Sequence, residues 1–208
     1  CHAGFGGIVP ETGEYYCFLE TIAGGYGGRF QSDGPDAVQS HGQNTENAPI
    51  EETESNYPVR ILRYELIPDS EGAGRHRGGL GLRRDYTFLH NDVTFTVLAD
   101  RDKAGPWGLF GGEPGLKAQY LLIKGSDTEF LDSKVTVHLD PGDVISYRTC
   151  GGGGYGPPVE RDPAQVLDDF IVGKISLNRA LDAYKVVILP DSKSIDFQAT
   201  NELRGELK

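Results

Sequence analysis

Glycine limits how this chain can fold more than any other residue. It makes up 29 of the 208 residues, about twice the usual share. Much of it gathers in three clusters, residues 24–28, 74–81 and 151–156. Such clusters are typical of tight turns and of backbones that approach each other closely, which is the role we expect here.

The third cluster formally matches the GxGxxG pattern of dinucleotide-binding turns. Such a turn must lead directly into a helix N-terminus, so that the helix dipole meets the pyrophosphate. Here Pro157 and Pro158 follow the cluster, and the first helix is expected only near Pro163. The spacing therefore argues against a dinucleotide site. The sequence also lacks the GxxxxGK[ST] motif, so a P-loop for ATP is not expected.

Charge and cysteine content narrow the classes of function. Lys and Arg number 20 and Asp and Glu 31, which gives a formal net charge of −11. That charge disfavours nucleic acid and anionic lipid surfaces as partners. Apolar runs such as residues 186–189 are short, whereas a membrane-spanning helix needs about 20 apolar residues. The three cysteines lack paired spacing, which predicts free thiols and a cytoplasmic protein.

Residues 1–157 are expected to form a β-rich domain. Apolar and β-branched residues alternate or cluster in segments 15–23, 59–67, 82–90, 93–99, 119–124, 135–139 and 144–147. Their connections are too short for crossover helices, which favours antiparallel pairing. Asn91 and Asp92 predict a tight hairpin between two of these strands. Residues 140–143, with Pro then Gly at the centre, predict a type II turn.

Residues 158–208 change to helical patterns and are expected to pack on that domain. Asp162 can cap a helix that begins at Pro163, and Gly173 suits its C-terminal end. Ser176 can cap a second short helix that runs to Tyr184, and residues 199–207 predict another. The fold class is therefore α+β, with a β-rich, mostly antiparallel body and a C-terminal helical hairpin.

A long polar segment, residues 31–57, matches neither a strand nor a helix. A loop of this length in a compact domain is usually functional, an interface or disordered. The segment holds His41 near several carboxylates, and imidazole with carboxylate suits Mn, Fe or Zn. The same composition also fits a solvated loop, in which the acidic run 51–54 is an exposed face.

Four arginines form the only basic cluster in this acidic sequence. They are Arg75, Arg77, Arg83 and Arg84. Arginine binds carboxylate or phosphate through paired donors, so the cluster could bind an anionic ligand. It could equally pair with the acidic segment of this chain or of another.

Several stretches of the chain form a recognisable set. They are ETIAGGYGGR (20–29), DGPDAVQSHGQNTENAPIEETE (33–54), YPVRILRYELIPDSEGAGRHRGGLG (57–81), GPWGLFGGEPG (105–115) and GGGGYGPPVERDPAQVLDDFIVGKIS (151–176). In this order they resemble the C-terminal part of the hydantoinase B/5-oxoprolinase family. The resemblance covers nearly the whole chain, and DSEGAGRHRGGLG together with GGGGYG is specific.

The resemblance implies an ATP-dependent system of several chains. Family members are similar to the B component of hydantoinases and N-methylhydantoinases, to half of 5-oxoprolinase, and to a large subunit of acetone and acetophenone carboxylases. There a partner A component uses ATP to phosphorylate a carbonyl-derived oxygen, and the B component completes the reaction, typically at a metal site. We therefore expect hydrolytic opening of a small cyclic amide such as a hydantoin, an N-methylhydantoin or an oxoproline-like ring, together with an ATP-binding hydantoinase A-like subunit.

The chain departs from the family in length. Family B components are much longer, and their metal motifs, HxxD and HHxDxGG, lie in an N-terminal part that has no counterpart in this sequence. We therefore expect a separate chain to supply the N-terminal portion of the B component. The divalent metal, Mn, Zn or Fe, is expected on that partner chain, and no metal ligand is assigned here.

The family's H..NT.N.P.E..E run matches the polar segment residue by residue. On this resemblance, the catalytic candidates are His41, Glu51 and Glu54. The substrate-binding candidates are Asn44, Asn47, Arg29 and Asp33. Arg75 and Arg77 are expected to fix the neighbouring glycine turns rather than to contact substrate.

Two other functions stay open. A subunit of an acetone- or acetophenone-type carboxylase would form a carbon–carbon bond with bicarbonate instead of breaking a C–N bond. A non-catalytic assembly module would bind the partner chains and close their site. A shared fold does not fix the chemistry, so the fold does not separate a carboxylase from a hydrolase. Dependence of the reaction on bicarbonate distinguishes the two. The assembly module predicts that alanine substitutions in the polar segment change affinity but leave turnover alone.

Overall fold

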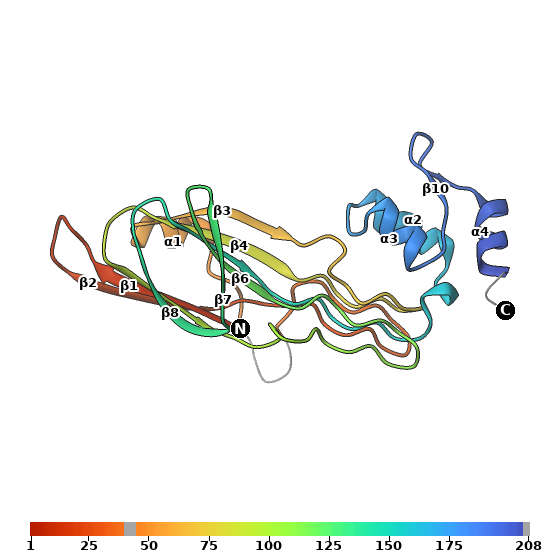
Figure 1. The fold of residues 1–208 in the computed structure, drawn as a ribbon, viewed down its shortest axis with the longest axis horizontal. Coiled ribbons are helices and arrows are strands. Elements are labelled where there is room, and N and C mark those ends of the chain that lie inside the picture. Colours follow the sequence, from red (N-terminus) through yellow and green to blue (C-terminus); the bar gives the residue numbers. More distant parts are fainter. Residues whose placement is uncertain (40–44, 206–208) are drawn as a thin grey trace.

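Two antiparallel sheets form a sandwich at one end of the molecule (Figure 1). The computed structural model describes residues 1–39 and 45–205. One sheet has the strand order β2-β1-β5-β8, with β1 at His2–Ile8, β2 at Tyr15–Thr21, β5 at Val93–Leu98 and β8 at Lys134–Leu139. The other has the order β3-β4-β9-β6-β7, with β3 at Val59–Leu66, β4 at Leu82–Phe88, β6 at Gln119–Lys124, β7 at Asp127–Leu131 and β9 at Val144–Arg148.

Aromatic side chains from both sheets fill the core between them. The ring of Phe5 on β1 lies 5.3 Å from that of Phe88 and 6.4 Å from that of Phe95, measured between centroids. Tyr86 on β4 lies 5.6 Å from Phe95 on β5. The first of these contacts is edge-to-face, the second stacked and the third tilted. Aromatic rings commonly pack in these ways, and the contacts of Phe5 with Phe88 and of Tyr86 with Phe95 join the two sheets.

The predicted hairpin at Asn91 and Asp92 is wrong. β4 lies in the five-stranded sheet and β5 in the four-stranded sheet, so this turn carries the chain from one sheet to the other. Asp92 has a φ of 60°, as a tight turn allows. Both strands present alternate apolar residues to one shared core. The two strands of a hairpin and two strands joined at a sandwich corner share this pattern, so the sequence did not distinguish them.

The turn predicted at residues 140–143 is confirmed. The N–H of Asp143 donates to the carbonyl of Asp140 at 3.1 Å, and Gly142 has a φ of 87°. This turn also changes sheets, because β8 and β9 belong to different ones. All the predicted strand segments contain strands and the pairing is antiparallel, but β1 and β7 were not predicted.

Glycine-rich segments run side by side between the sandwich and the helices (Figure 1). We call residues 24–28, 72–81, 105–116 and 151–156 the glycine bundle. Backbone bonds join them: Gly79 donates to Tyr26 at 2.7 Å, and Gly152 donates to Gly79 at 2.9 Å. A Cβ atom on Gly25 would collide with the Gly79 carbonyl oxygen, so only glycine permits this approach. The predicted close backbone packing is therefore confirmed.

The predicted C-terminal helical hairpin is confirmed, caps included. Helix α2, Pro163–Ile171, begins where the Asp162 side chain accepts a bond from the Ala164 N–H at 2.9 Å. Helix α3, Leu177–Asp182, begins where the Ser176 hydroxyl accepts one from the Arg179 N–H at 3.1 Å. Buried residues of both helices form a second core with Ala73 of the glycine bundle.

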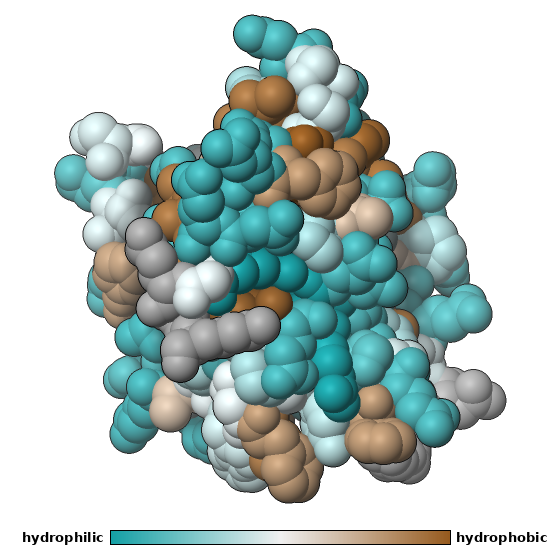
Figure 2. Space-filling view, turned by 90° about the vertical axis from the view of Figure 1, so that its right-hand side faces the viewer, coloured by the Kyte–Doolittle hydropathy of each residue, from teal (hydrophilic) through white to brown (hydrophobic). Residues whose placement is uncertain are grey.

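Short elements complete the C-terminal segment. They are the 3-10 turn η1 at Pro158–Glu160, a ladder of β10 at Ile188–Leu189 with β11 at Ser194–Ile195, and α4 at Phe197–Gly205. Helix α4 begins before residue 199, the start that the sequence predicted. Seen from this end of the molecule, hydrophilic residues cover most of the surface and hydrophobic ones form small patches (Figure 2).

One part of the polar segment is not a loop, which corrects the prediction for residues 31–57. Ile50–Asn56 form helix α1. Glu51 and Glu52 lie in its first turn, where negative charge favours the helix dipole. Only Thr53 is buried, so the helix has almost no apolar stripe for sequence periodicity to reveal. Within the described ranges no helix is long and apolar enough to cross a membrane.

We expect Gly25→Ala to lower the free energy of unfolding by about 3 kcal/mol or to prevent folding, because the added methyl overlaps the Gly79 and Gly152 backbones. Gly27→Ala in the same cluster is the control, since its Cβ would lie 3.8 Å from the nearest atom, the Gly153 carbonyl oxygen. Urea denaturation of both variants measures the difference. Equal stabilities would show that the close approach does not constrain the fold.

Candidate functional site

A buried polar cluster lies between the sheets, near the ends of β2 and β4 that adjoin the glycine bundle. Glu20 and Arg84 approach to 3.3 Å, and the Tyr86 hydroxyl donates to Glu20 Oε1. All three side chains are buried. The Tyr64 ring lies 4.7 Å from the Arg84 guanidinium carbon. We call Glu20, Arg84 and Tyr86 the inner cluster.

Burial raises the pKa of Glu20, and the nearby Arg84 and Tyr86 only partly oppose it. Burial and the adjacent Glu20 also raise the pKa of Tyr86, which keeps its hydroxyl a donor. Glu20 Oε2 and the Nε and Nη1 atoms of Arg84 have no hydrogen-bond partner among the described residues. A buried pair of this kind is costly to desolvate, so losing one member would leave the other uncompensated.

The inner cluster and the adjacent end of β2 hold the middle of the polar segment. Arg84 donates to the carbonyl of Ala48 at 3.1 Å. Beside it, the side-chain amides of Gln39 and Asn47 both donate to the carbonyl of Thr21, at 3.0 and 3.2 Å. The described residues on either side of 40–44 therefore converge on one backbone oxygen at the end of β2. The amide group of Asn47, a substrate-binding candidate, is engaged in this anchor.

A second network holds the polar segment near its first residues. Asp33 accepts two bonds of 2.7 Å from Arg161, and the N–H of Arg77 donates to it at 3.0 Å. Asp169 of α2 accepts from Arg77 at 3.0 Å and from Arg161 at 2.8 Å. We call Asp33, Arg77, Arg161 and Asp169 the junction network, because it joins the polar segment, the glycine bundle and α2.

Charges in this network determine the ionisation of Asp33. Burial alone would raise its pKa, but the bond and charge of Arg161 and the charge of Arg77 outweigh burial and hold the pKa below its usual value. Burial would likewise raise the pKa of Asp36, but Lys174 and Arg77 outweigh burial and hold that pKa below its usual value. Both carboxylates are therefore ionised at neutral pH and stabilise the folded state.

The other candidates lie apart from these two networks. Arg29 is exposed and makes one long contact, 3.5 Å, to the carbonyl of Asp33. Glu54 accepts from the N–H of Ile61 and from Arg60, and these bonds lower its pKa. Glu51 is exposed on the first turn of α1. The candidates His41 and Asn44 lie outside the described residues.

The basic cluster pairs within the chain. Its ion pairs are Arg75–Glu160 at 3.5 Å, Arg77–Asp36 at 3.0 Å, Arg83–Asp85 at 2.6 Å and Arg84–Glu20 at 3.3 Å. Arg77 also donates to the carbonyl of Gly78 at 2.9 Å, which confirms that it fixes a glycine turn. Each of the four guanidinium groups therefore has an acidic partner within the chain.

The structure does not bring the described candidates into one pocket. Asp33, Asn47 and Glu54 each make a contact that holds the polar segment in place, at different points of the fold. The sequence analysis missed Glu20 and Arg161, whose partners are distant in the chain. Among the described residues no group of three or more His, Cys, Asp and Glu is placed to hold a metal ion.

Comparison with known proteins assigns the family. Residues 1–158 match the family model described as hydantoinase B/oxoprolinase. The chain belongs to this family. It is 42% identical over 205 residues to a putative D-/L-hydantoinase B component of Pseudomonas sp. (strain NS671), covering 95% of this chain and 34% of that protein. The chain therefore spans about a third of the length of this relative.

Two solved structures share the fold. An ATP-dependent caprolactamase from Pseudomonas jessenii matches with a TM-score of 0.81 and 28% identity, covering 98% of this chain and 37% of the other. A nucleotide-free acetone carboxylase matches with a TM-score of 0.86 over 99% of this chain and 32% of the other. At 20% identity the carboxylase match shows the fold alone.

Asp33→Asn should weaken the acid sensitivity of stability. The folded-state pKa of Asp33 lies below the unfolded value of about 3.9, so its stabilisation is complete above that pH and is lost as the pH falls through the folded value. The variant should be less stable at pH 7 and lose less stability below about pH 4 than the unmodified protein. Urea denaturation of the variant and of the unmodified protein, from pH 7 to below about pH 4, measures the two stability profiles. Asp132→Asn, at an exposed site outside the network, should keep the original profile.

Arg84→Met should cost about 3–5 kcal/mol of unfolding free energy, because it leaves Glu20 buried without its cation. Adding Glu20→Gln should restore part of that stability by removing the stranded charge. The control Arg60→Met removes an exposed ion pair and should cost less than about 1 kcal/mol. A double variant no more stable than Arg84→Met would contradict the mutual dependence of this pair.

Proposed function

We propose that this chain is the C-terminal portion, or a small subunit, of an ATP-dependent cyclic-amide hydrolase of hydantoinase B type. Its substrate is a hydantoin, an N-methylhydantoin or an oxoproline-like ring. The observation that carries the proposal is the 42% identity to a hydantoinase B component over 95% of this chain. The match to an ATP-dependent caprolactamase, which is also named for a cyclic amide, supports it.

The reaction requires partners. An unstrained amide is a poor electrophile, so phosphorylation of its oxygen by ATP activates it before water attacks. We place ATP on a hydantoinase A-like subunit. We place the divalent metal, Mn, Zn or Fe, on the N-terminal portion of the B component, carried by a separate chain. A cytoplasmic location is part of the proposal. The three free cysteines support it.

In this proposal the candidate residues divide by what they contact. His41, Asn44 and Glu51 face the substrate or the joint with the metal-bearing part, His41 as the acid or base that Glu51 orients. Asp33, Asn47 and Glu54, whose polar groups are engaged within the chain, position the polar segment beside the substrate, and Arg29 supports the turn at Asp33. The convergence of Gln39 and Asn47 on Thr21 supports this division, because it fixes the flanks of residues 40–44.

Two alternatives each have an observation in their favour. The carboxylase alternative has the acetone carboxylase fold, with a TM-score of 0.86. The assembly-module alternative has the structural contacts of Asp33, Asn47 and Glu54. Sequence identity favours the hydrolase, since the hydantoinase relative is 42% identical and the carboxylase 20%.

The test uses the assembly recovered through a tag on this chain from its own cells. Supplied with ATP and a panel of hydantoins and lactams, it should open a ring with release of ADP and without added bicarbonate. Product formation that depends on bicarbonate would instead establish the carboxylase function.

His41→Ala should lower the turnover of that assembly at least about tenfold without preventing assembly, the low end of what a positioned acid or base contributes. Asn201→Ala, at an exposed position of α4, is the control and should match the unmodified assembly. A change of less than about twofold would remove His41 from the site. A change in subunit affinity with unchanged turnover would favour the assembly module.

A further inference from the structure

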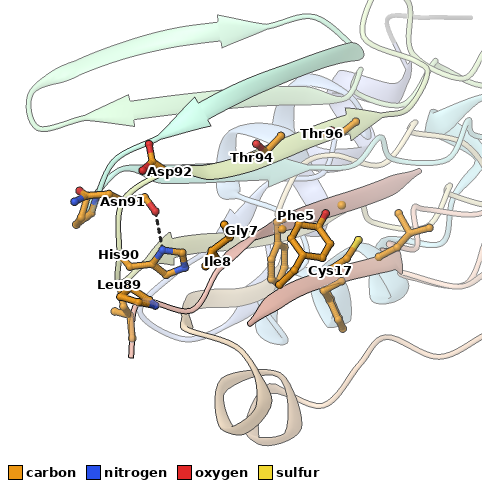
Figure 3. Close-up of a pocket in the computed structure, with 17 residues that line it drawn as sticks. Phe5, Gly7, Ile8, Cys17, Leu89, His90, Asn91, Asp92, Thr94 and Thr96 are labelled. Carbon is orange, nitrogen blue, oxygen red and sulfur yellow. Dashed lines mark hydrogen bonds between the residues drawn. The ribbon is translucent and has the colours of Figure 1, made fainter. Parts of the chain in front are cut away.

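A groove with a volume of about 960 Å³ runs over the outer face of the four-stranded sheet (Figure 3). Its floor is β1, at Gly4 and Gly6. One wall is β2, with Tyr15, Cys17 and Leu19, and the other is β5, with Thr94 and Thr96. The turns that leave β1 and β4 close one end, near Ile8 and His90 (Figure 3).

Glycine creates the trough. Gly4 and Gly6 occupy outward positions of β1, where a side chain would fill the space between its neighbours. A Cβ atom on Gly4 would lie 3.3 Å from Leu19 Cδ1, and one on Gly6 would lie 3.1 Å from the Tyr15 hydroxyl oxygen. The side chains of Leu19 and Tyr15 therefore lean over a floor with no side chains of its own.

The groove is almost uncharged in an acidic, highly charged chain. Among its lining residues Asp92 is the only Asp, Glu, Lys or Arg, whereas a quarter of the whole chain is charged. Tyr15 is 73% exposed and Leu19 66% exposed. The hydroxyls of Thr96 and its neighbour Thr136 bond each other at 3.0 Å, so part of the hydrogen-bonding capacity on this face is used within the chain. Apolar side chains without nearby charge are typical of the centre of an interface.

The outer face of the other sheet provides the contrast. There Arg83 pairs with Asp85 at 2.6 Å, and Arg63 lies 3.4 Å from Glu65 and 3.7 Å from Asp85. Over β3 and β4 that face is a network of charged side chains, whereas over β6 and β7 it carries the apolar side chains of Leu121, Ile123 and Phe130. The charged half of that face is the part that contrasts with the groove.

We propose that this groove is the docking site for the part of the hydantoinase B component that lies outside residues 1–208. This chain spans 34% of the hydantoinase relative and 37% of the caprolactamase chain, so most of such a component must pack outside the fold described. The docked segment is apolar and uncharged where it crosses Gly4 and Gly6. The proposal rests on family membership and not on the substrate or the reaction.

Cys17 is a natural reporter for this surface, because it is free, exposed and on the wall of the groove. In the assembly recovered from its own cells, Cys17 should react with a maleimide at least about tenfold more slowly than in the same protein unfolded in urea. Mass spectrometry of the Cys17 peptide measures both rates. Native and unfolded rates within about threefold would overturn the proposal.

The control is a Thr128→Cys variant of the same assembly. Thr128 is exposed on β7, opposite Ile123, and lies on the outer face of the five-stranded sheet. A cysteine there should react within about threefold of its unfolded rate, which shows that the reagent reaches the native assembly.

A cross-linker attached to Cys17 identifies the occupant. The expected product joins Cys17 to a peptide of the B component from outside residues 1–208. A product with a second copy of these residues, or with the ATP-using subunit, would overturn the proposal. Neither readout uses activity, so failure here is distinguishable from failure of the proposed function.

Discussion

The contact between glycine backbones is the constraint on which the rest of this fold depends. In the glycine bundle, chains lie so close that a single methyl group at Gly25 or Gly152 would overlap the neighbouring backbone. The aromatic core of the sandwich is on one side of this bundle and the small helical core is on the other. Both cores are conventional side-chain packing. Between them lies a region in which backbone contacts at glycine, rather than side-chain packing, set how closely the chains approach.

The bundle buries few hydrophobic side chains, Ala73 and Leu80 among them, and polar groups also join it to the rest of the molecule. The junction network connects it to α2 and to the polar segment through Asp33, Arg77, Arg161 and Asp169. At the sandwich end the inner cluster holds the polar segment instead, through the bond that Arg84, paired with Glu20, donates to the carbonyl of Ala48. Buried charges are costly unless each has its partner, and this requirement specifies how the parts fit together more strictly than apolar packing would. The polar segment is held because it supplies partners to both networks.

Local features of this structure could be predicted from sequence, and long-range ones could not. The caps at Asp162 and Ser176 and the turn at Gly142 depend on neighbouring residues, and all three are found as expected. The sheet to which a strand belongs depends on distant partners, so the turn at Asp92 was misassigned. Strand β1 was missed because its glycines dilute the apolar alternation. For the candidate site, the length and polarity of residues 31–57 marked the segment, and family resemblance supplied the candidate residues within it. Its anchors Glu20 and Arg161 gave no local signal.

The convergence of Gln39 and Asn47 on the Thr21 carbonyl has a consequence for how the sandwich and the polar segment are coupled. A carbonyl oxygen has two lone pairs, and here both flanks of residues 40–44 use the same atom. That atom lies at the end of β2, so any displacement of this strand end moves both flanks together. A substitution inside the sandwich can therefore change how both flanks are held without touching either of them.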